Sequence, residues 1–165
     1  MEKKISFILF AMFIVFSLSL VSCNDDNDDD ETSPSGNNGS QSGYVLQNGV
    51  TYNIGYDGAE VEVRLNDNTL YAVDFNNGAD KHVNDITSVG KVSGLSSITQ
   101  IPGSGWNKSV KVNNGHGYVI RCHRIMHYGG NDYGYTYVRL YIKEIITDTS
   151  GGILGVRAIW DALKL

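Results

Sequence analysis

The chain has 165 residues, among them 19 glycines, 10 tyrosines and only 2 prolines, and its formal net charge is −5. Residues 44–165 hold eleven basic and eleven acidic side chains, so the negative charge lies in the segment before them. This balance excludes the strongly basic surface typical of nucleic-acid-binding proteins, and we expect no nucleic-acid partner. The length suffices for one domain, and the glycine and tyrosine content favours a turn-rich β protein.

The first 22 residues have the pattern of an export signal. Lys3 and Lys4 precede an apolar run over residues 5–21, which is short for a spanning helix and is not followed by a basic cluster. An uncleaved anchor helix is the alternative interpretation. The run ends in Leu20-Val21-Ser22-Cys23, which resembles the lipobox of bacterial lipoproteins, where the signal is cut before the cysteine. The resemblance implies that the Cys23 thiol carries acyl chains such as palmitate and anchors the protein in a membrane.

An acidic block follows the predicted lipidation site. Its members are Asp25, Asp26, Asp28, Asp29, Asp30 and Glu31. Acidic residues at this place resemble the surface-export signal of Bacteroidota lipoproteins, which implies an outer-membrane protein that faces the outside of the cell. A solvated spacer is the plainer alternative. A calcium-binding EF-hand loop is rejected, because its glycine and its last glutamate would fall on Glu31 and Asn37. Residues 32–43, rich in Ser, Gly and Asn, complete a flexible tether over 23–43.

Residues 44–165 are predicted to form a single β domain. Strand patterns bounded by turn residues cover residues 50–54, 61–66 and 70–75, and longer ones cover 117–128, 133–147 and 153–160. Only short strands and ordered loops are expected over residues 79–108, and one helical turn is expected at 161–165. Since no longer helix pattern is present, the fold class is all-β: a single antiparallel β-sandwich, roll or small barrel.

Alternation along residues 133–147 sorts the side chains onto two faces. Val138, Leu140, Ile142 and Ile146 form a predicted core face, and the other face carries tyrosines and two cations. Tyrosine combines an apolar body with a polar tip, which suits a sugar or a protein ligand, and Trp106 in a glycine-rich loop offers a further ring. The candidate ligand-binding residues are Trp106, Tyr133, Tyr135, Tyr137, Arg139 and Tyr141, with Lys143 at the end of the row. The alternative is that cross-strand aromatic pairs only stabilise an exposed sheet.

Histidines and a cysteine lie close together in the sequence, but their spacing predicts neither a metal site nor a catalytic site. His123 and His127, four apart on a strand, are separated by about 13 Å and cannot share one metal ion without other ligands. Cys122 alternates with apolar residues and is expected to be a small buried thiol, with His123 on the opposite face. No phosphate loop, dinucleotide fingerprint or nucleophile elbow is present. We therefore predict no catalytic residue, metal or cofactor.

Four segments of the C-terminal half resemble a known module. They are residues 103–106 (GSGW), 115–121 (GHGYVIR), 137–142 (YVRLYI) and 149–155 (TSGGILG). This pattern is similar to a module of uncharacterised surface lipoproteins from Bacteroides-type gut bacteria, a Bacteroidota family. The matching residues are turn glycines and strand residues, so the resemblance implies a fold and no activity.

These expectations combine into one functional prediction. The chain is interpreted as a non-enzymatic, lipid-anchored cell-surface lipoprotein whose β domain binds a glycan or a partner protein of the envelope. A cell-surface hydrolase is the first alternative, because its carboxylates can be distant in sequence. A structural accessory subunit that pairs sheet edges with another protein is the second.

Overall fold

The computed structural model describes residues 43–55, 61–78, 80–126 and 132–164. These residues form ten strands, and every pairing between two of these strands is antiparallel. One 3-10 turn, η1 (Leu95–Ser97), lies between β6 (Asp80–Lys91) and β7 (Ser109–Lys111). The predicted all-β fold of antiparallel sheets is confirmed. No helix within the described ranges is long and apolar enough to cross a membrane.

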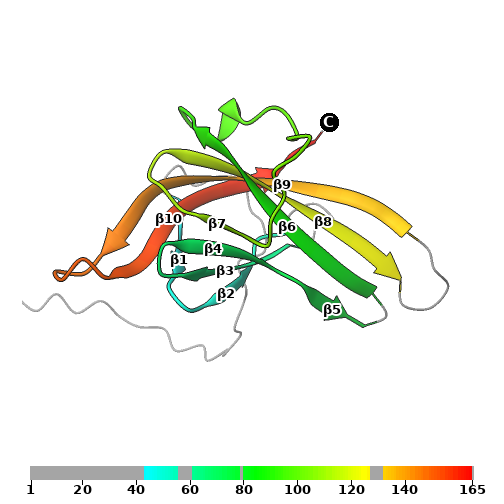
Figure 1. The fold of residues 1–165 in the computed structure, drawn as a ribbon, viewed down its shortest axis with the longest axis horizontal. Helices are drawn as coiled ribbons and strands as arrows, with labels where there is room; N and C mark the ends of the chain where they lie inside the picture. Colours follow the sequence, from blue (N-terminus) through cyan, green and yellow to red (C-terminus); the bar gives the residue numbers. More distant parts are fainter. Residues whose placement is uncertain (1–42, 56–60, 79, 127–131, 165) are drawn as a thin grey trace, which may run out of the picture. The chain divides into compact units, whose positions relative to one another are not determined.

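The strands form two sheets. Sheet A has the order β1 (Tyr44–Gln47), β10 (Ile153–Ala162), β9 (Asp132–Thr147), β8 (His116–Met126), β6 (Asp80–Lys91) and β5 (Phe75–Asn77). Sheet B has the order β2 (Thr51–Asn53), β3 (Glu62–Asn66), β4 (Thr69–Val73) and β7 (Ser109–Lys111). Figure 1 shows the long strands of sheet A side by side and the short strands of sheet B in a second layer.

The main core fills the space between the two sheets. Alternation correctly predicts the buried residues Val63 and Leu65 of β3, which are at most 1% exposed, and Val138, Leu140 and Ile142 of β9, which are fully buried. Ile146 was also expected on the core face, and that prediction is wrong: the pairing of β9 with β10 shifts between Ile142 and Glu144, and Ile145 packs against the core instead. The other buried apolar members include Leu46, Ile54, Val61, Leu70, Ile86, Tyr118, Ile120, Val156 and Ala158. Burying one such side chain stabilises the fold by about 1.5–3 kcal/mol, so this layer is the principal source of stability.

A second, smaller core covers part of the outer face of sheet A, which is the face turned away from sheet B. The segment 92–107, which contains η1, packs there around Ile98, Val119 and Leu163. Gly117 makes the close approach possible, because a Cβ atom at this position would lie 2.7 Å from Ile98 Cδ1 and 2.8 Å from Val89 Cγ2.

The chain passes between the sheets at two places. After β4 it crosses at Asp74 from sheet B into β5 of sheet A. The segment before β7 crosses in the other direction: Asn107 pairs with Ile86 at the edge of β6, and Lys108 O then accepts a hydrogen bond from Ala72 N (2.9 Å) of β4. Residues 106–108 therefore reach from the outer face of sheet A to sheet B.

Two predictions of secondary structure are wrong. Residues 79–108 were expected to hold only short strands, yet Asp80–Lys91 forms the 12-residue strand β6. Its pattern is hidden because the inner face carries the polar residues Asp80, His82 and Asn84, which are all buried. The helical turn expected at 161–165 is replaced by the end of β10, which runs to Ala162.

Candidate functional site

The candidate site lies on the outer face of sheet A, where β8 and β9 pair. Arg121 lies opposite Tyr137, and His123 lies opposite Tyr135 in the strand register. Directly opposed residues of an antiparallel pair share a face and interact. The rings of His123 and Tyr135 are stacked with centroids 4.6 Å apart, and those of Tyr135 and Tyr137 are 6.4 Å apart.

Trp106 reaches this surface from a different part of the chain. Gly105 has φ 84°, and its carbonyl accepts a hydrogen bond from Asn107 Nδ2 (2.8 Å), which fixes the loop beside β6. The Trp106 ring then lies 6.3 Å from the Tyr137 ring. We call the contiguous surface made by Trp106, Arg121, His123, Tyr135 and Tyr137 the aromatic shelf.

Arg121 holds the shelf together. Its guanidinium carbon lies 4.6 Å from the centroid of the Trp106 ring and 5.2 Å from that of Tyr135. Its Nε and Nη2 atoms pair with Asp85 Oδ2 at 3.1 and 3.0 Å. A guanidinium over aromatic faces contributes about 0.5–2 kcal/mol per contact, so Arg121 helps to hold both rings in place.

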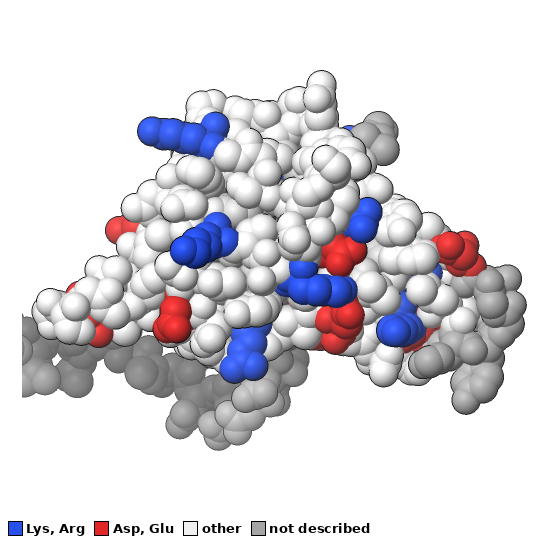
Figure 2. All heavy atoms as spheres, in the orientation of Figure 1, with Lys and Arg blue, Asp and Glu red and all other residues white. Residues whose placement is uncertain are grey.

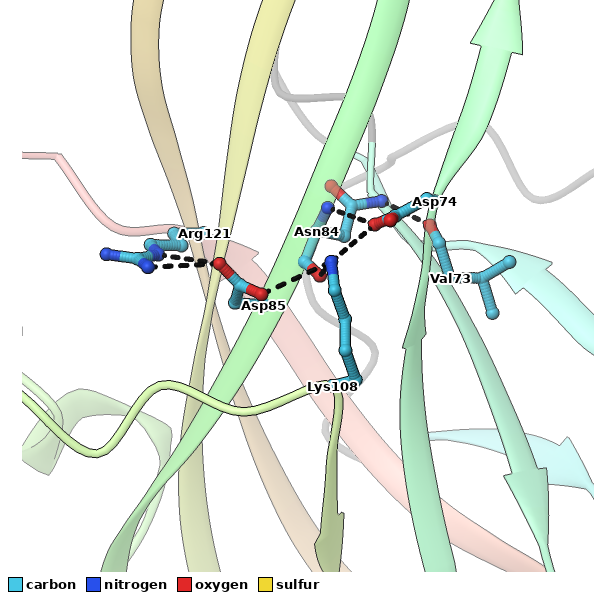
Figure 3. Close-up of polar contacts among 6 residues, drawn as sticks. All are labelled: Val73, Asp74, Asn84, Asp85, Lys108 and Arg121. Atoms are coloured by element: carbon cyan, nitrogen blue, oxygen red, sulfur yellow. Dashed lines mark hydrogen bonds and ion pairs between the residues drawn. The ribbon is translucent and has the colours of Figure 1, made fainter.

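Asp85 belongs to a chain of charges that continues toward sheet B. Figure 3 shows Arg121, Asp85, Lys108 and Asp74 in a row. Lys108 Nζ donates to Asp74 Oδ1 (2.7 Å), to Asn84 O (2.7 Å) and to Asp85 Oδ1 (3.2 Å). The backbone N–H of Asn84 also donates to Asp74 Oδ1 (2.8 Å), and its Nδ2 donates to Val73 O (2.6 Å).

The electrostatic surroundings keep Lys108 charged. Partial burial lowers the pKa of its ammonium group, but the hydrogen bonds and charges of Asp74 and Asp85 outweigh burial and raise the pKa above 10.5. The three protons of the ammonium group are all directed at oxygen atoms. Lys108 is therefore a permanent cation that joins β6, the β4–β5 crossing and the segment before β7.

His123 and Asp132 close one side of the shelf. His123 Nε2 lies 2.7 Å from Asp132 Oδ1, which also accepts a hydrogen bond from Gly134 N (2.7 Å). The bonds from Gly134 and His123 lower the pKa of Asp132, so the carboxylate is charged at neutral pH. Tyr135 is the most exposed ring of the shelf at 48%, whereas Trp106 and Tyr137 are half-buried.

Tyr133 does not share the face of Tyr135, and that part of the prediction is wrong. Asp132 pairs with Ile125 and Tyr135 pairs with His123, so Tyr133 and Gly134 both lie opposite the single residue Arg124. This β-bulge, with Gly134 at φ 75°, reverses the alternation. The Tyr133 ring consequently lies 4.9 Å from the Arg124 guanidinium carbon, and its hydroxyl contacts Met126 Sδ (3.3 Å).

Arg139 is on the predicted face but is engaged within the protein. Its Nε and Nη2 atoms donate to both carboxylate oxygens of Asp161 (2.5 and 2.9 Å), and Nη1 donates to Ile98 O (2.9 Å). The Asp161 hydrogen bonds raise the pKa of Arg139. This residue therefore attaches the segment around η1 to sheet A, and it separates Tyr141, two positions further along β9, from the shelf.

Cys122 is buried as predicted, at 1% exposure. Its Sγ atom lies 3.5 Å from Nδ1 of His82, a residue for which the sequence pattern predicts no role. His82 is 2% exposed and stacks on Phe75 with ring centroids 4.4 Å apart. Because both members of the pair lie inside the main core, we read this contact as part of its packing.

The sequence pattern did not identify three residues of this site. Two of them, Arg121 and His123, belong to the aromatic shelf, and the third, Asp85, supports it by pairing with Arg121. Counting back from residues 129–132, whose Gly-Gly-Asn-Asp sequence predicts a turn, would have placed positions 121 and 123 opposite the tyrosines, but the bulge at Gly134 makes that count uncertain by one residue. Cys23, the acidic block of residues 25–31, and His127 lie outside the described residues. Within the described ranges, no group of three His, Cys, Asp or Glu side chains is placed to hold a metal ion.

Comparison with known proteins gives no further assignment. No protein-family model, no curated protein and no solved structure matches this chain.

Proposed function

We propose that this chain is a non-enzymatic, lipid-anchored surface protein of a bacterial outer membrane whose β domain binds a glycan at the aromatic shelf. The observation that carries the proposal is the contiguous ring surface of Trp106, Tyr135 and Tyr137 around the Arg121 guanidinium. A sugar ring presents an apolar face bordered by hydroxyl groups. Tyrosine and tryptophan offer the matching combination of a flat apolar body and a polar tip.

Preorganisation supports the same proposal. The β8–β9 register fixes Tyr135 and Tyr137, and the pairing of Asn107 with Ile86 fixes the loop that carries Trp106. Rings that are already ordered lose little conformational freedom on binding, so more of the contact energy appears as affinity. An exposed, rigid tyrosine such as Tyr135 is the kind of residue that dominates binding surfaces.

The membrane part of the proposal is supported by the sequence alone. The lipobox-like ending at Cys23 provides the attachment point, and several acyl chains hold a protein on a membrane where one chain binds only marginally. The tether of residues 23–43 would allow the β domain to reorient above the membrane and to meet a polymeric ligand.

Binding is tested by titrating the purified full chain with a panel of neutral and acidic polysaccharides while the tryptophan fluorescence is followed. For any polysaccharide that binds, Tyr135→Ser is expected to weaken binding at least about ten-fold, because a buried aromatic contact is worth about 1.4 kcal/mol or more. Tyr133→Ser is the matched control: it lies on the same strand at 51% exposure, but on the opposite face.

Three results would contradict the proposal. Equal losses in the two tyrosine variants would show that the shelf is not the contact surface. Release of product from a polysaccharide would favour the hydrolase alternative. Co-purification of a partner protein at fixed stoichiometry, unchanged in Tyr135→Ser, would favour the accessory-subunit alternative.

The proposed location on the cell surface is tested by protease shaving of intact cells. The natural chain is expected to be shaved, and a variant whose acidic block is changed to Asn and Gln is expected to be protected. Cys23→Ser is expected to release the chain from the membrane fraction. Protection of the natural chain would place the domain in the periplasm and would contradict surface display.

A further inference from the structure

A groove lies on the outer side of sheet B, away from the aromatic shelf. It has a volume of about 360 Å³ and is lined by Arg64, Asn66, Tyr71, Ala72, Val73 and Lys108. On the face that Figure 2 draws, charged side chains of both signs are scattered with wide uncharged areas between them. The groove brings two cations, an amide and an exposed ring together.

The pleat of two paired strands creates the groove. On β3, the side chains of Arg64 and Asn66 point outward because Val63 and Leu65 fill the core. Tyr71 of β4 lies directly opposite Arg64 in the register and is 40% exposed. Lys108 forms the wall beside β4, where its carbonyl oxygen accepts the hydrogen bond from Ala72 N.

The two cations of the groove have different roles. The three ammonium protons of Lys108 are directed at Asp74, Asn84 O and Asp85, so this residue offers its aliphatic stem and a fixed charge. Arg64 is exposed, and no described residue forms an ion pair with it. Its planar fork of donors is suited to a carboxylate.

The charge balance around the groove also favours an anion. Of the two cations that line the groove, Lys108 is already paired with Asp74 and Asp85, and Arg64 is the one whose charge no described carboxylate neutralises. A ligand with a single carboxylate would neutralise that charge without leaving another group unpaired.

We propose that this groove binds a sugar acid, a pyranose ring that carries one carboxylate. The ring lies against Tyr71, Asn66 bonds to its hydroxyl groups, and Arg64 pairs with its carboxylate. The site is on the other sheet from the aromatic shelf and does not depend on the shelf being a binding surface.

The test uses the full chain in detergent micelles and ligand-observed NMR titrations with three probes. Galacturonate carries both the ring and the charge, its methyl ester keeps the ring and loses the charge, and benzoate keeps a carboxylate on a flat ring without hydroxyl groups. Galacturonate is expected to bind roughly ten-fold more tightly than its methyl ester, as the loss of a charge-assisted hydrogen bond predicts. It is also expected to bind more tightly than benzoate.

Variants locate the binding. Arg64→Gln and Tyr71→Ser are expected to lower the affinity for galacturonate roughly ten-fold, and Arg64→Lys is expected to restore only part of it, because lysine cannot form the bidentate pair. Lys111→Gln removes the same charge from an exposed residue of β7 that does not line the groove, and it is expected to leave binding unchanged. Tyr135→Ser is expected to leave it unchanged as well.

Several outcomes would overturn the proposal. They are the absence of galacturonate binding, equal binding of its methyl ester, tighter binding of benzoate, or an unaltered affinity in Arg64→Gln. A thermal unfolding curve of each variant that matches the natural chain excludes misfolding as the cause of a loss.

Discussion

At the scale of single residues, Lys108 connects parts of the chain that are far apart in sequence. Its ammonium group joins Asp74 at the β4–β5 crossing with Asn84 and Asp85 on β6 (Figure 3). Asp85 in turn pairs with Arg121 under the aromatic shelf. The orientation of Trp106 and Tyr135 therefore depends on a charge network that begins on the other sheet.

We predict that Lys108→Met lowers the free energy of unfolding by about 1 kcal/mol, because Asp74 and Asp85 lose their shared cation while water still screens them. The side chain of Lys108 is 51% exposed, which keeps the expected effect small. Urea unfolding at neutral pH measures it. The control is Lys111→Met, an exposed lysine three residues further along the chain, at the end of β7. Equal effects of the two substitutions would show that the network contributes nothing.

At the scale of elements, one glycine permits the second core. Gly117 on β8 lies under Ile98 and Val89, and a Cβ atom there would come within 3.0 Å of both side chains. The segment that these contacts hold against sheet A leads directly into the loop of Trp106. The position of Trp106 in the aromatic shelf therefore depends on the packing of Ile98 and Val89 over Gly117, which lie several residues away from it.

We predict that Gly117→Ala lowers the free energy of unfolding by about 1–3 kcal/mol through overpacking. The same substitution is expected to lower the affinity for any ligand that binds at the aromatic shelf. Gly103→Ala is the control, because no atom lies within 4 Å of a Cβ built at Gly103 and its φ is not positive. Urea unfolding measures the free energy of unfolding of both variants. Equal free energies for Gly117→Ala and Gly103→Ala would contradict the prediction.

The turn between β9 and β10 is closed by Asp148. Its carboxylate accepts hydrogen bonds from Ser150 Oγ (2.7 Å) and from the backbone N–H groups of Gly152 and Ser150 (both 2.8 Å). The Ser150 hydroxyl and then these N–H groups lower the pKa of Asp148 below its ordinary value of 3.8. The turn therefore depends on the ionised form of this side chain.

The pH dependence follows from that shift. The unfolded chain binds the proton at a higher pH than the folded chain, so the stabilisation is present above about pH 4 and is lost as the pH falls through the folded-state pKa. We predict that Asp148→Asn is less stable than the natural chain at pH 6 and that the difference shrinks by pH 2. Urea midpoints of both proteins across this range measure it, and a constant difference would refute the assignment.

At the scale of the whole domain, the two cores share sheet A. Tyr118 and Ile120 of β8 face the main core, whereas Val119 between them faces the second core. Because the same strands carry both cores, losing the packing on one face of sheet A destabilises the strands that hold the packing on the other face. The described β domain should therefore unfold as one cooperative unit.

We predict that Trp160→Phe, which leaves Trp106 as the only tryptophan, unfolds at the same urea concentration by fluorescence and by far-UV circular dichroism. Trp106 reports on the second core and circular dichroism on both sheets. An earlier fluorescence transition would show that the segment 92–107 detaches independently.

Much of the fold follows from local pattern. The strands around residues 51–53, 62–66, 116–126, 132–147 and 153–162 were predicted within a few residues, because alternation and turn glycines act over short distances. Strand β6 was not predicted, because buried Asp80, His82 and Asn84 break its alternation. Their polar groups are tolerated inside only because residues from other strands contact them, such as Arg124 for Asp80 and Val73 for Asn84.

The candidate site divides in the same way. The sequence by itself determined that Tyr135 and Tyr137 lie on the face of β9 opposite Val138 and Leu140, since the side-chain period of a strand is a local property. Only the tertiary structure decided that Trp106 joins them, that Tyr133 leaves them at the Gly134 bulge, and that Arg139 is held by Asp161. Those outcomes depend on which distant segments pack together, and a pattern that repeats every two residues carries no information about its partners.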